Sequence, residues 1–260
     1  MTSAGGVEST GGVQSVGRAF EILEVIAARG GELSLSEIAA SVGLPAPSAH
    51  RLLRTLVSLG YLRQETSRRY ALAPRLIRLG DAAAKQFGTW GYPVLTGLME
   101  AIGESANMAI LEGTNAIYVA QVAGRHSMRM FTEVGRRVPL HATGVGKALL
   151  AQLPDDEILR ILDLAGMRSI TPHTVTDPNV LLQELRASRI RGYLTDDGEQ
   201  EVGVSCVSVP VPNAPAPTAI SISAPTPRMT PDVIRQAATA LREAAATITE
   251  RFDRERVATG

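Results

Sequence analysis

Arginines gather in one short stretch of the sequence. Between Ala46 and Gly80 there are seven arginines and one acidic residue, Glu65, so this stretch carries a net charge of +6 although the 260-residue chain is neutral overall. Clustered guanidinium groups bind phosphates, and arginine also reads guanine in the major groove of DNA. The charge distribution therefore predicts a nucleic-acid-binding surface, although the zero net charge taken alone would argue against one.

A second group of polar residues lies in the last two thirds of the chain. Gly144 and Gly146 stand where a loop enters an expected helix, a position at which backbone N–H groups can face an anion. Ser221 and Ser223 are two residues apart in an expected strand, so both hydroxyls lie on one face of the sheet. Asp196 could accept a hydrogen bond from a ligand hydroxyl. Together these residues favour a site for a small polar molecule.

Each of these features also has a purely structural explanation. The glycines can serve only a turn, the serines can be solvated on an outer face, and Cys206 can be a small buried apolar residue. An enzyme could use Cys206 as nucleophile with His141 or His173 as base, but no surrounding sequence marks an activated thiol. With one cysteine and four histidines, no metal site or cofactor is expected. We therefore expect a binding protein rather than an enzyme.

Three short helices are predicted before the basic hairpin. Apolar residues at i, i+3, i+4 and i+7 indicate a helix from Gln14 that ends at a glycine pair. A second helix is capped by Ser34 or Ser36 and is followed by Gly43, which suits a left-handed turn. A third helix follows over PAPSAHRLLRTLVSLG. Its buried stripe comprises Leu52, Leu53, Leu56 and Leu59.

A two-stranded wing follows Gly60, because YLRQETSRRYAL alternates apolar and polar residues around a short polar turn. Helix, helix, turn, helix and wing is the order of a winged helix-turn-helix, in which the third helix enters the major groove. The alternative is a three-helix bundle whose arginines solvate an exposed face. The candidate DNA contacts on the third helix and the wing tip are Ser48, His50, Arg51, Arg54, Arg68 and Arg69.

The rest of the chain mixes helices and strands. Pro74 to Phe87 reads as a connecting helix, a further helix follows over VLTGLMEAIGE, and a hairpin and a strand near SMRMFTEV come next. Three helices and three strands are then predicted, and Thr230 with Pro231 begins a final helix. This order predicts an α+β fold with helices packed on an antiparallel sheet.

The N-terminal segments VQSVGRAFEILEVIA, LSLSEIAASVGLPAPSAHRLLRTLVSLGYL and RRYAL resemble the DNA-binding domain of the IclR family. One departure concerns the start of the third helix. The family often has a Lys-Ser-Thr type of sequence after the turn proline, whereas this chain has Ala46, Pro47 and Ser48. The operator sequence therefore cannot be taken from relatives.

The C-terminal half resembles the GAF-like effector domain of the same family from about Tyr92 to Phe252, through VPLHATGVGKALLA, GYLTDDGEQEVGVSCVSVPV and TAISISAPTPRMT. The resemblance implies that a small metabolite binds at Gly144, Val145, Asp196, Cys206, Ser221 and Ser223. It looks most similar to the subgroup that senses glyoxylate and controls the use of allantoin. Aromatic acids and other small acids remain alternatives.

The resemblance implies a transcriptional regulator that binds a palindromic DNA operator as a homodimer or homotetramer, and it favours a repressor, with activation left open. Met1–Gly12 contains no basic stretch or apolar run, and no segment has the roughly 18 apolar residues of a membrane span, so we expect a cytoplasmic protein. The expected segments are a disordered tail (1–13), a winged helix-turn-helix (14–74), a linker helix (75–91), an effector-binding domain (92–253) and a tail (254–260).

Overall fold

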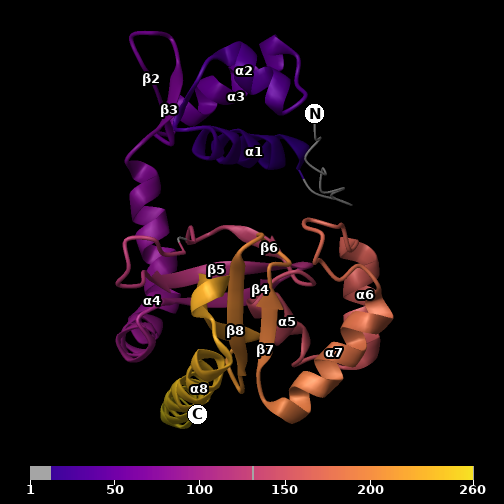
Figure 1. The fold of residues 1–260 in the computed structure, drawn as a ribbon. Helices are drawn as coiled ribbons and strands as arrows, with labels where there is room; N and C mark the ends of the chain where they lie inside the picture. Colours follow the sequence, from indigo (N-terminus) through magenta and orange to yellow (C-terminus); the bar gives the residue numbers. More distant parts are fainter. Residues whose placement is uncertain (1–12, 131, 260) are drawn as a thin grey trace. The chain divides into compact units, whose positions relative to one another are not determined.

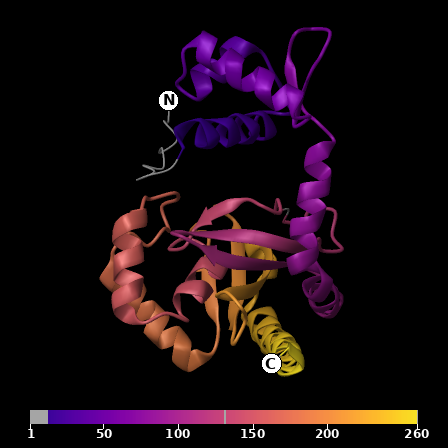
Figure 2. The same cartoon turned by 180° about the vertical axis from the view of Figure 1, so that it is seen from behind.

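The computed structural model describes residues 13–130 and 132–259, without the side chains of 84–90 and 255–259 (Figures 1 and 2). The tail expected before residue 13 lies outside the described residues. The chain divides into two compact units, residues 1–83 and 84–260, and each is described by itself. No described helix combines the length and apolar character needed to cross a membrane.

The first unit is a helix-turn-helix followed by a small sheet. Its elements are α1 (Gln14–Ala28), β1 (Glu32–Leu33), α2 (Leu35–Ser41), α3 (Ala46–Ser58), β2 (Leu62–Gln64) and β3 (Tyr70–Leu72). The strands form an antiparallel sheet in the order β1-β3-β2, so the wing has a third strand that the sequence did not reveal. In the core, apolar side chains of all three helices pack against those of the wing. It includes Ile22, Ile26, Ile38, Leu53, Leu56, Leu62 and Tyr70.

The turn between α2 and α3 follows from the local sequence. Ser34 caps α2, because its hydroxyl accepts the Glu37 N–H while the Glu37 carboxylate accepts the Ser34 N–H at 2.7 Å. This reciprocal pair satisfies two N–H groups that a helix start leaves free. Gly43 adopts φ +63°, a backbone angle that glycine reaches without strain. The expected cap and turn are both confirmed.

The second unit contains a six-stranded antiparallel sheet in the order β6-β5-β4-β9-β8-β7. Its strands are β4 (Ser105–Glu112), β5 (Asn115–Val122), β6 (Arg137–Pro139), β7 (Leu194–Asp197), β8 (Val204–Val211) and β9 (Thr218–Pro225). Its helices are α4 (Arg75–Ile102, which begins in the first unit), α5 (Gly144–Leu150), α6 (Asp155–Ala165), α7 (Pro178–Arg191), a short 3-10 turn (Thr226–Arg228) and α8 (Pro231–Thr259). The expected α+β class is confirmed.

The two faces of this sheet differ in chemistry. Val207, Ile220 and Ile222 face α8 and the end of α4, where they form an apolar core with Leu95 and Leu241. The alternate residues of the same strands face α5, α6 and α7, because successive side chains of a strand point to opposite faces. Figure 1 shows α8 on one side of the sheet and α5 on the other.

Three expectations for the later part of the chain differ from the structure. Residues 127–130 and 132–134 form no strand, and Phe131 lies outside the described residues. The loop is held instead by side chains, since the Ser105 hydroxyl donates to the Met130 carbonyl at 2.7 Å. The helix expected to end at Phe87 continues as α4 through Pro93 to Ile102, because one proline removes a single helical hydrogen bond. At the C-terminus, α8 extends through the expected tail to Thr259.

Candidate DNA-binding surface and effector site

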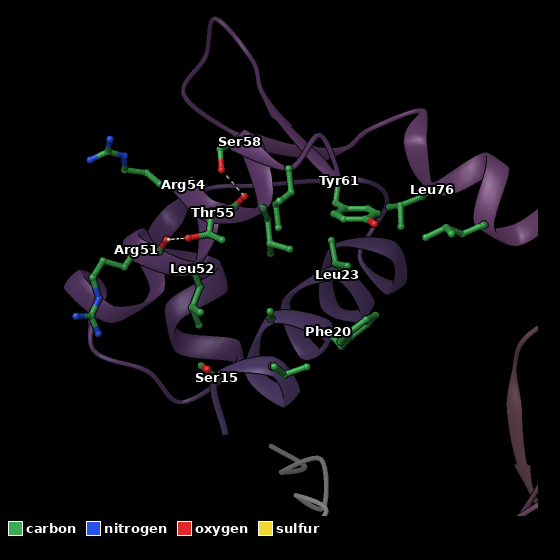
Figure 3. Close-up of a pocket in the computed structure, with 15 residues that line it drawn as sticks. Ser15, Phe20, Leu23, Arg51, Leu52, Arg54, Thr55, Ser58, Tyr61 and Leu76 are labelled. Carbon is green, nitrogen blue, oxygen red and sulfur yellow. Dashed lines mark hydrogen bonds between the residues drawn. The ribbon is translucent and has the colours of Figure 1, made fainter. Parts of the chain in front are cut away.

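The outer face of α3 carries two arginine side chains that have no hydrogen-bond or ion-pair partner among the described residues. Ala49, Leu53 and Leu56 bury the inner face of the helix, while Arg51 and Arg54 are exposed. Figure 3 shows both guanidinium groups extending away from the apolar residues of the domain. His50 is also exposed and Ser48 is half-buried on the first turn. These four positions therefore form one continuous polar face on the third helix of the motif.

The two wing arginines differ in their contacts. Arg68 is exposed at the hairpin turn with φ +63°, an angle that non-glycine residues seldom adopt. Arg69 donates to the Glu37 carboxylate at 2.9 Å and to the Glu32 carbonyl at 3.1 Å. The structure thus gives Arg69 a bracing contact, between the wing and the start of α2, that the sequence did not indicate.

An apolar groove lies on the same unit, between α1, α3 and the first turns of α4 (Figure 3). Its volume is about 830 Å³. The residues lining it include Phe20, Leu23, Leu52, Tyr61, Leu76 and Leu79. The Phe20 side chain is 61% exposed, which is unusual for a large aromatic residue in a domain of this size. An exposed apolar surface of this kind is typical of a contact with another protein or of a ligand groove.

The expected effector residues meet on the polar face of the six-stranded sheet. Directly opposite partners in an antiparallel sheet share a face, and Asp196 pairs with Cys206, which pairs with Ser223. In the neighbouring row, Ser221 lies opposite Asn107 of β4. The side chains of Ser221 and Ser223 lie on one face of the sheet, as expected. Both are buried, which excludes a solvated outer face.

Helix α5 covers this polar face through its first residues. The Ser208 hydroxyl donates to the Gly144 carbonyl at 2.6 Å, and a side chain at Gly144 would come within 3.0 Å of the Cys206 Cβ. Val145 is buried beside it. Five of the expected effector residues thus lie around one region, with Ser221 adjacent in the same sheet face.

The expectation for Gly146 was wrong. Its N–H does not face a ligand, because it donates to the Thr143 hydroxyl, which caps α5. Glycine is needed there for packing, since a Cβ would lie 2.5 Å from the Leu140 backbone. Gly146 therefore brings the helix close to the preceding loop, which is the structural explanation that the sequence left open.

Burial changes the ionisation of the groups in this region. Loss of solvent is the main reason why the pKa of Asp196 is raised to about 7; the Glu199 N–H, which donates to Oδ1 at 2.8 Å, opposes the shift, and the negative charge of Glu199 adds to it. Burial next to Cys206 and Asp196 also raises the pKa of Tyr118. Asp196 is therefore close to an equal mixture of its neutral and charged forms near neutral pH.

Cys206 lacks the environment of a nucleophile. Burial and the negative charge of Asp196 raise the pKa of its thiol, so the reactive thiolate is suppressed. The thiol donates to the Ser223 hydroxyl at 3.1 Å. His141 bonds to the Arg168 carbonyl and His173 is exposed, so neither histidine is paired with the thiol among the described hydrogen bonds.

A buried lysine beneath this site was missed by sequence reasoning. Lys147 of α5 is fully buried and its amino group contacts both oxygens of Glu184, at 2.9 and 3.0 Å, and Oε1 of Glu199 at 2.5 Å. A charged residue within the apolar run GVGKALL was the available signal, because a buried lysine needs a charged partner. The network ties α5 to α7 and to the loop after β7.

Both units of this chain match domains of known proteins. Residues 15–66 match the IclR helix-turn-helix domain, and residues 89–250 match the C-terminal domain described as bacterial transcriptional regulator IclR C-terminal. The chain belongs to the IclR family. It is 35% identical over 248 residues to the transcriptional repressor IclR of Escherichia coli, covering 93% of this chain and 90% of the relative.

Other IclR-family proteins are similar over most of their length. The HTH-type transcriptional repressor AllR of Salmonella paratyphi A is 33% identical, covering 85% of this chain and 83% of the relative. The crystal structure of an IclR transcriptional regulator from Alicyclobacillus acidocaldarius has a TM-score of 0.83 at 27% identity and covers 93% and 99% of the two chains. These relatives are regulators of transcription and not enzymes, so this IclR-family chain is a DNA-binding regulator.

Proposed function

We propose that this IclR-family regulator is a repressor that binds a palindromic operator as a homodimer or homotetramer and changes its DNA affinity when a small acid or ureide binds the second unit. The observation that supports this most directly is the row of Asp196, Cys206 and Ser223 beneath α5, in which Asp196 and Ser223 are buried and Cys206 is half-buried, because buried hydroxyls and carboxyls without a catalytic partner are suited to binding. A regulator of this kind acts at the chromosome, hence in the cytoplasm.

In this proposal, α3 reads the operator. Ser48, His50, Arg51 and Arg54 contact base edges and phosphates in the major groove, since these are the polar residues on the outer face of the helix. Arg68 at the wing tip contacts the flanking backbone. The ion pair with Glu37 revises the role expected for Arg69, which braces the wing so that Arg68 is held in position.

The effector contacts are Gly144, Val145, Asp196, Cys206, Ser221 and Ser223. We propose glyoxylate or an allantoin-pathway compound as first choices, because the effector region resembles that of the glyoxylate-sensing subgroup. An aromatic acid is the alternative. A carboxylate beside an ionised Asp196 would be repelled, so the pKa near 7 supports an acidic ligand that binds the neutral form of this residue.

A second copy of the chain covers the apolar groove of the first unit in this proposal. One winged helix reads too few base pairs for specific binding in a genome, so two copies are needed. Exposed Phe20, Val16 and Leu79 supply the apolar contact. Phe20→Asp should give a monomer in sedimentation and lose operator binding, whereas Val180→Asp, at an exposed valine of α7, should change neither. A wild-type monomer that protects a short asymmetric site would refute the proposal.

The effector site is tested by removing both hydroxyls, as Ser221→Ala with Ser223→Ala. A DNA fragment selected by the wild-type protein serves as operator in a gel-shift titration, and calorimetry measures ligand binding. Effector binding should change the wild-type operator affinity by about 5- to 150-fold. The double variant should lose this response and keep its operator affinity without ligand.

The matched control is Ser205→Ala. It removes the hydroxyl of a buried serine of β8 that donates to Asp197 and does not belong to the row of Asp196, Cys206 and Ser223. It should respond to ligand as the wild type does. A double variant that still responds at the original ligand concentration would show that the effector binds elsewhere.

A further inference from the structure

Asn107 stands at the centre of the polar sheet face, between the effector serines and β5. It is fully buried on β4, opposite Ser221 of β9 and Gln121 of β5. Its amide nitrogen donates to the Ser223 hydroxyl oxygen at 3.1 Å and to the Ser221 hydroxyl oxygen at 3.4 Å. One side chain thus contacts both serines, although the resemblance to the family assigned it no role.

These two hydrogen bonds determine whether each serine hydroxyl can donate a hydrogen bond to a ligand or accept one from it. A serine hydroxyl has one hydrogen to donate and two lone pairs that accept. The Ser223 oxygen accepts from Asn107 and from the Cys206 thiol, so both of its acceptor positions are filled. Its hydrogen is left to donate. Ser221 likewise accepts from Asn107, and in the described part of the chain neither serine hydrogen has a protein acceptor.

A buried donor without an acceptor is costly, so a ligand that supplies the acceptors is favoured at this position. Two adjacent hydroxyls that must donate match the two oxygens of a carboxylate, because an ionised carboxylate only accepts hydrogen bonds. We infer that Asn107 is the positioning residue that sets the specificity of the effector site, by orienting Ser221 and Ser223 as donors to a carboxylate. This inference rests on the effector-binding function proposed above.

The test replaces the amide by a carboxylate of the same shape, as Asn107→Asp. The new side chain offers no N–H and accepts instead, so the serine hydrogens turn toward it and the ligand meets oxygen lone pairs. Calorimetry on the full chain compares glyoxylate with glycolaldehyde, which has a hydroxymethyl group in place of the carboxylate. Each hydrogen bond to a charged acceptor contributes about tenfold or more to affinity.

The wild type should therefore bind glyoxylate about 100-fold more tightly than glycolaldehyde, and this ratio should fall by about 100-fold in Asn107→Asp. Asn115→Asp makes the same substitution at a partly exposed site on β5, where the amide nitrogen donates to the neighbouring Thr114 hydroxyl, and should leave the ratio unchanged. If the buried carboxylate prevents folding, Asn107→Leu removes the amide without adding charge, and the ratio should fall by about tenfold.

A merely structural asparagine would give a different pattern. Both ligands would then weaken together, and the ratio would stay within threefold of the wild-type value, which overturns the inference while the proposed function stands. A wild type that binds only glycolaldehyde, or neutral allantoin but no carboxylate, has the same consequence. If glyoxylate, allantoin and aromatic acids all fail to bind the wild type, the proposed function itself is refuted, and this inference with it.

Discussion

Replacing Lys147 with methionine should destabilise the second unit strongly. The methionine fills the space of the lysine stem, so the main change is the loss of the buried amino group that contacts Glu184 and Glu199. The Glu199 side chain is only 10% exposed, and its second oxygen already has no hydrogen-bond partner. Burial raises the pKa of this carboxyl even with the lysine present.

Breaking a buried ion pair by removing one partner costs about 3–5 kcal/mol, because an uncompensated charge remains. For a unit of this size the melting temperature falls by about 2–4 °C per kcal/mol, so the expected decrease is roughly 6–20 °C. Scanning calorimetry on the full chain measures the transition of the second unit. Adding Glu199→Gln to Lys147→Met should restore part of the lost melting temperature, since the uncompensated charge of Glu199 is removed.

Arg160→Met is the matched control, because Arg160 pairs with Glu157 at 3.7 Å on the exposed face of α6. Surface pairs of this kind contribute little, so its melting temperature should stay near that of the wild type. A decrease of less than about 3 °C in Lys147→Met, or no recovery in the double variant, would refute the view that Lys147 neutralises the buried Glu199 carboxylate together with the partly exposed Glu184.

Three further predictions concern single residues. Arg68→Ala should weaken operator and random DNA alike and reduce the salt dependence by about one unit in binding titrations, whereas Arg69→Ala, which breaks an exposed pair with Glu37, should lower the stability of the first unit by at most about 1 kcal/mol and leave the salt slope unchanged. Ser34→Ala should cost about 1 kcal/mol in chemical denaturation of the first unit, and an unchanged midpoint would exclude the capping role. Since burial raises the pKa of Asp196 from 3.8 to about 7, the stability that this group contributes is complete below pH 4 and is lost as pH rises through about 7. Asp196→Asn should remove this loss, so the variant should gain on the wild type between pH 4 and 8 in denaturation curves, and parallel pH profiles would contradict the assignment.

Local patterns predicted the parts of the fold that depend on neighbours in sequence. The cap at Ser34, the turn at Gly43 and the shared face of Ser221 and Ser223 follow from helix and strand periodicity. The resemblance to the IclR family predicted that Asp196 and Gly144, which are distant in the sequence, belong to one site. Periodicity alone carries no information on which strands pair, so the row across the sheet could not be derived from it.

The contacts that the sequence did not reveal are those between distant segments. Arg69 looked like a second cation of the wing tip, but it bonds to Glu37, 32 residues earlier. Gly146 looked available to a ligand until Thr143 proved to accept its N–H. Asn107 sits within the apolar run SANMAIL, and a polar residue there signals a buried partner without saying which one.

One face of the six-stranded sheet packs against α8, and the other face carries the residues that we propose contact the ligand. Residues such as Val207 and Ile222 form the apolar packing with α8, while their immediate neighbours Ser208 and Ser223 belong to the polar side. Substitutions at the polar positions of the strands can thus change ligand preference while the packing against α8 stays the same. A library randomised at Asn107, Ser221 and Ser223 should yield mostly folded regulators that respond to different metabolites.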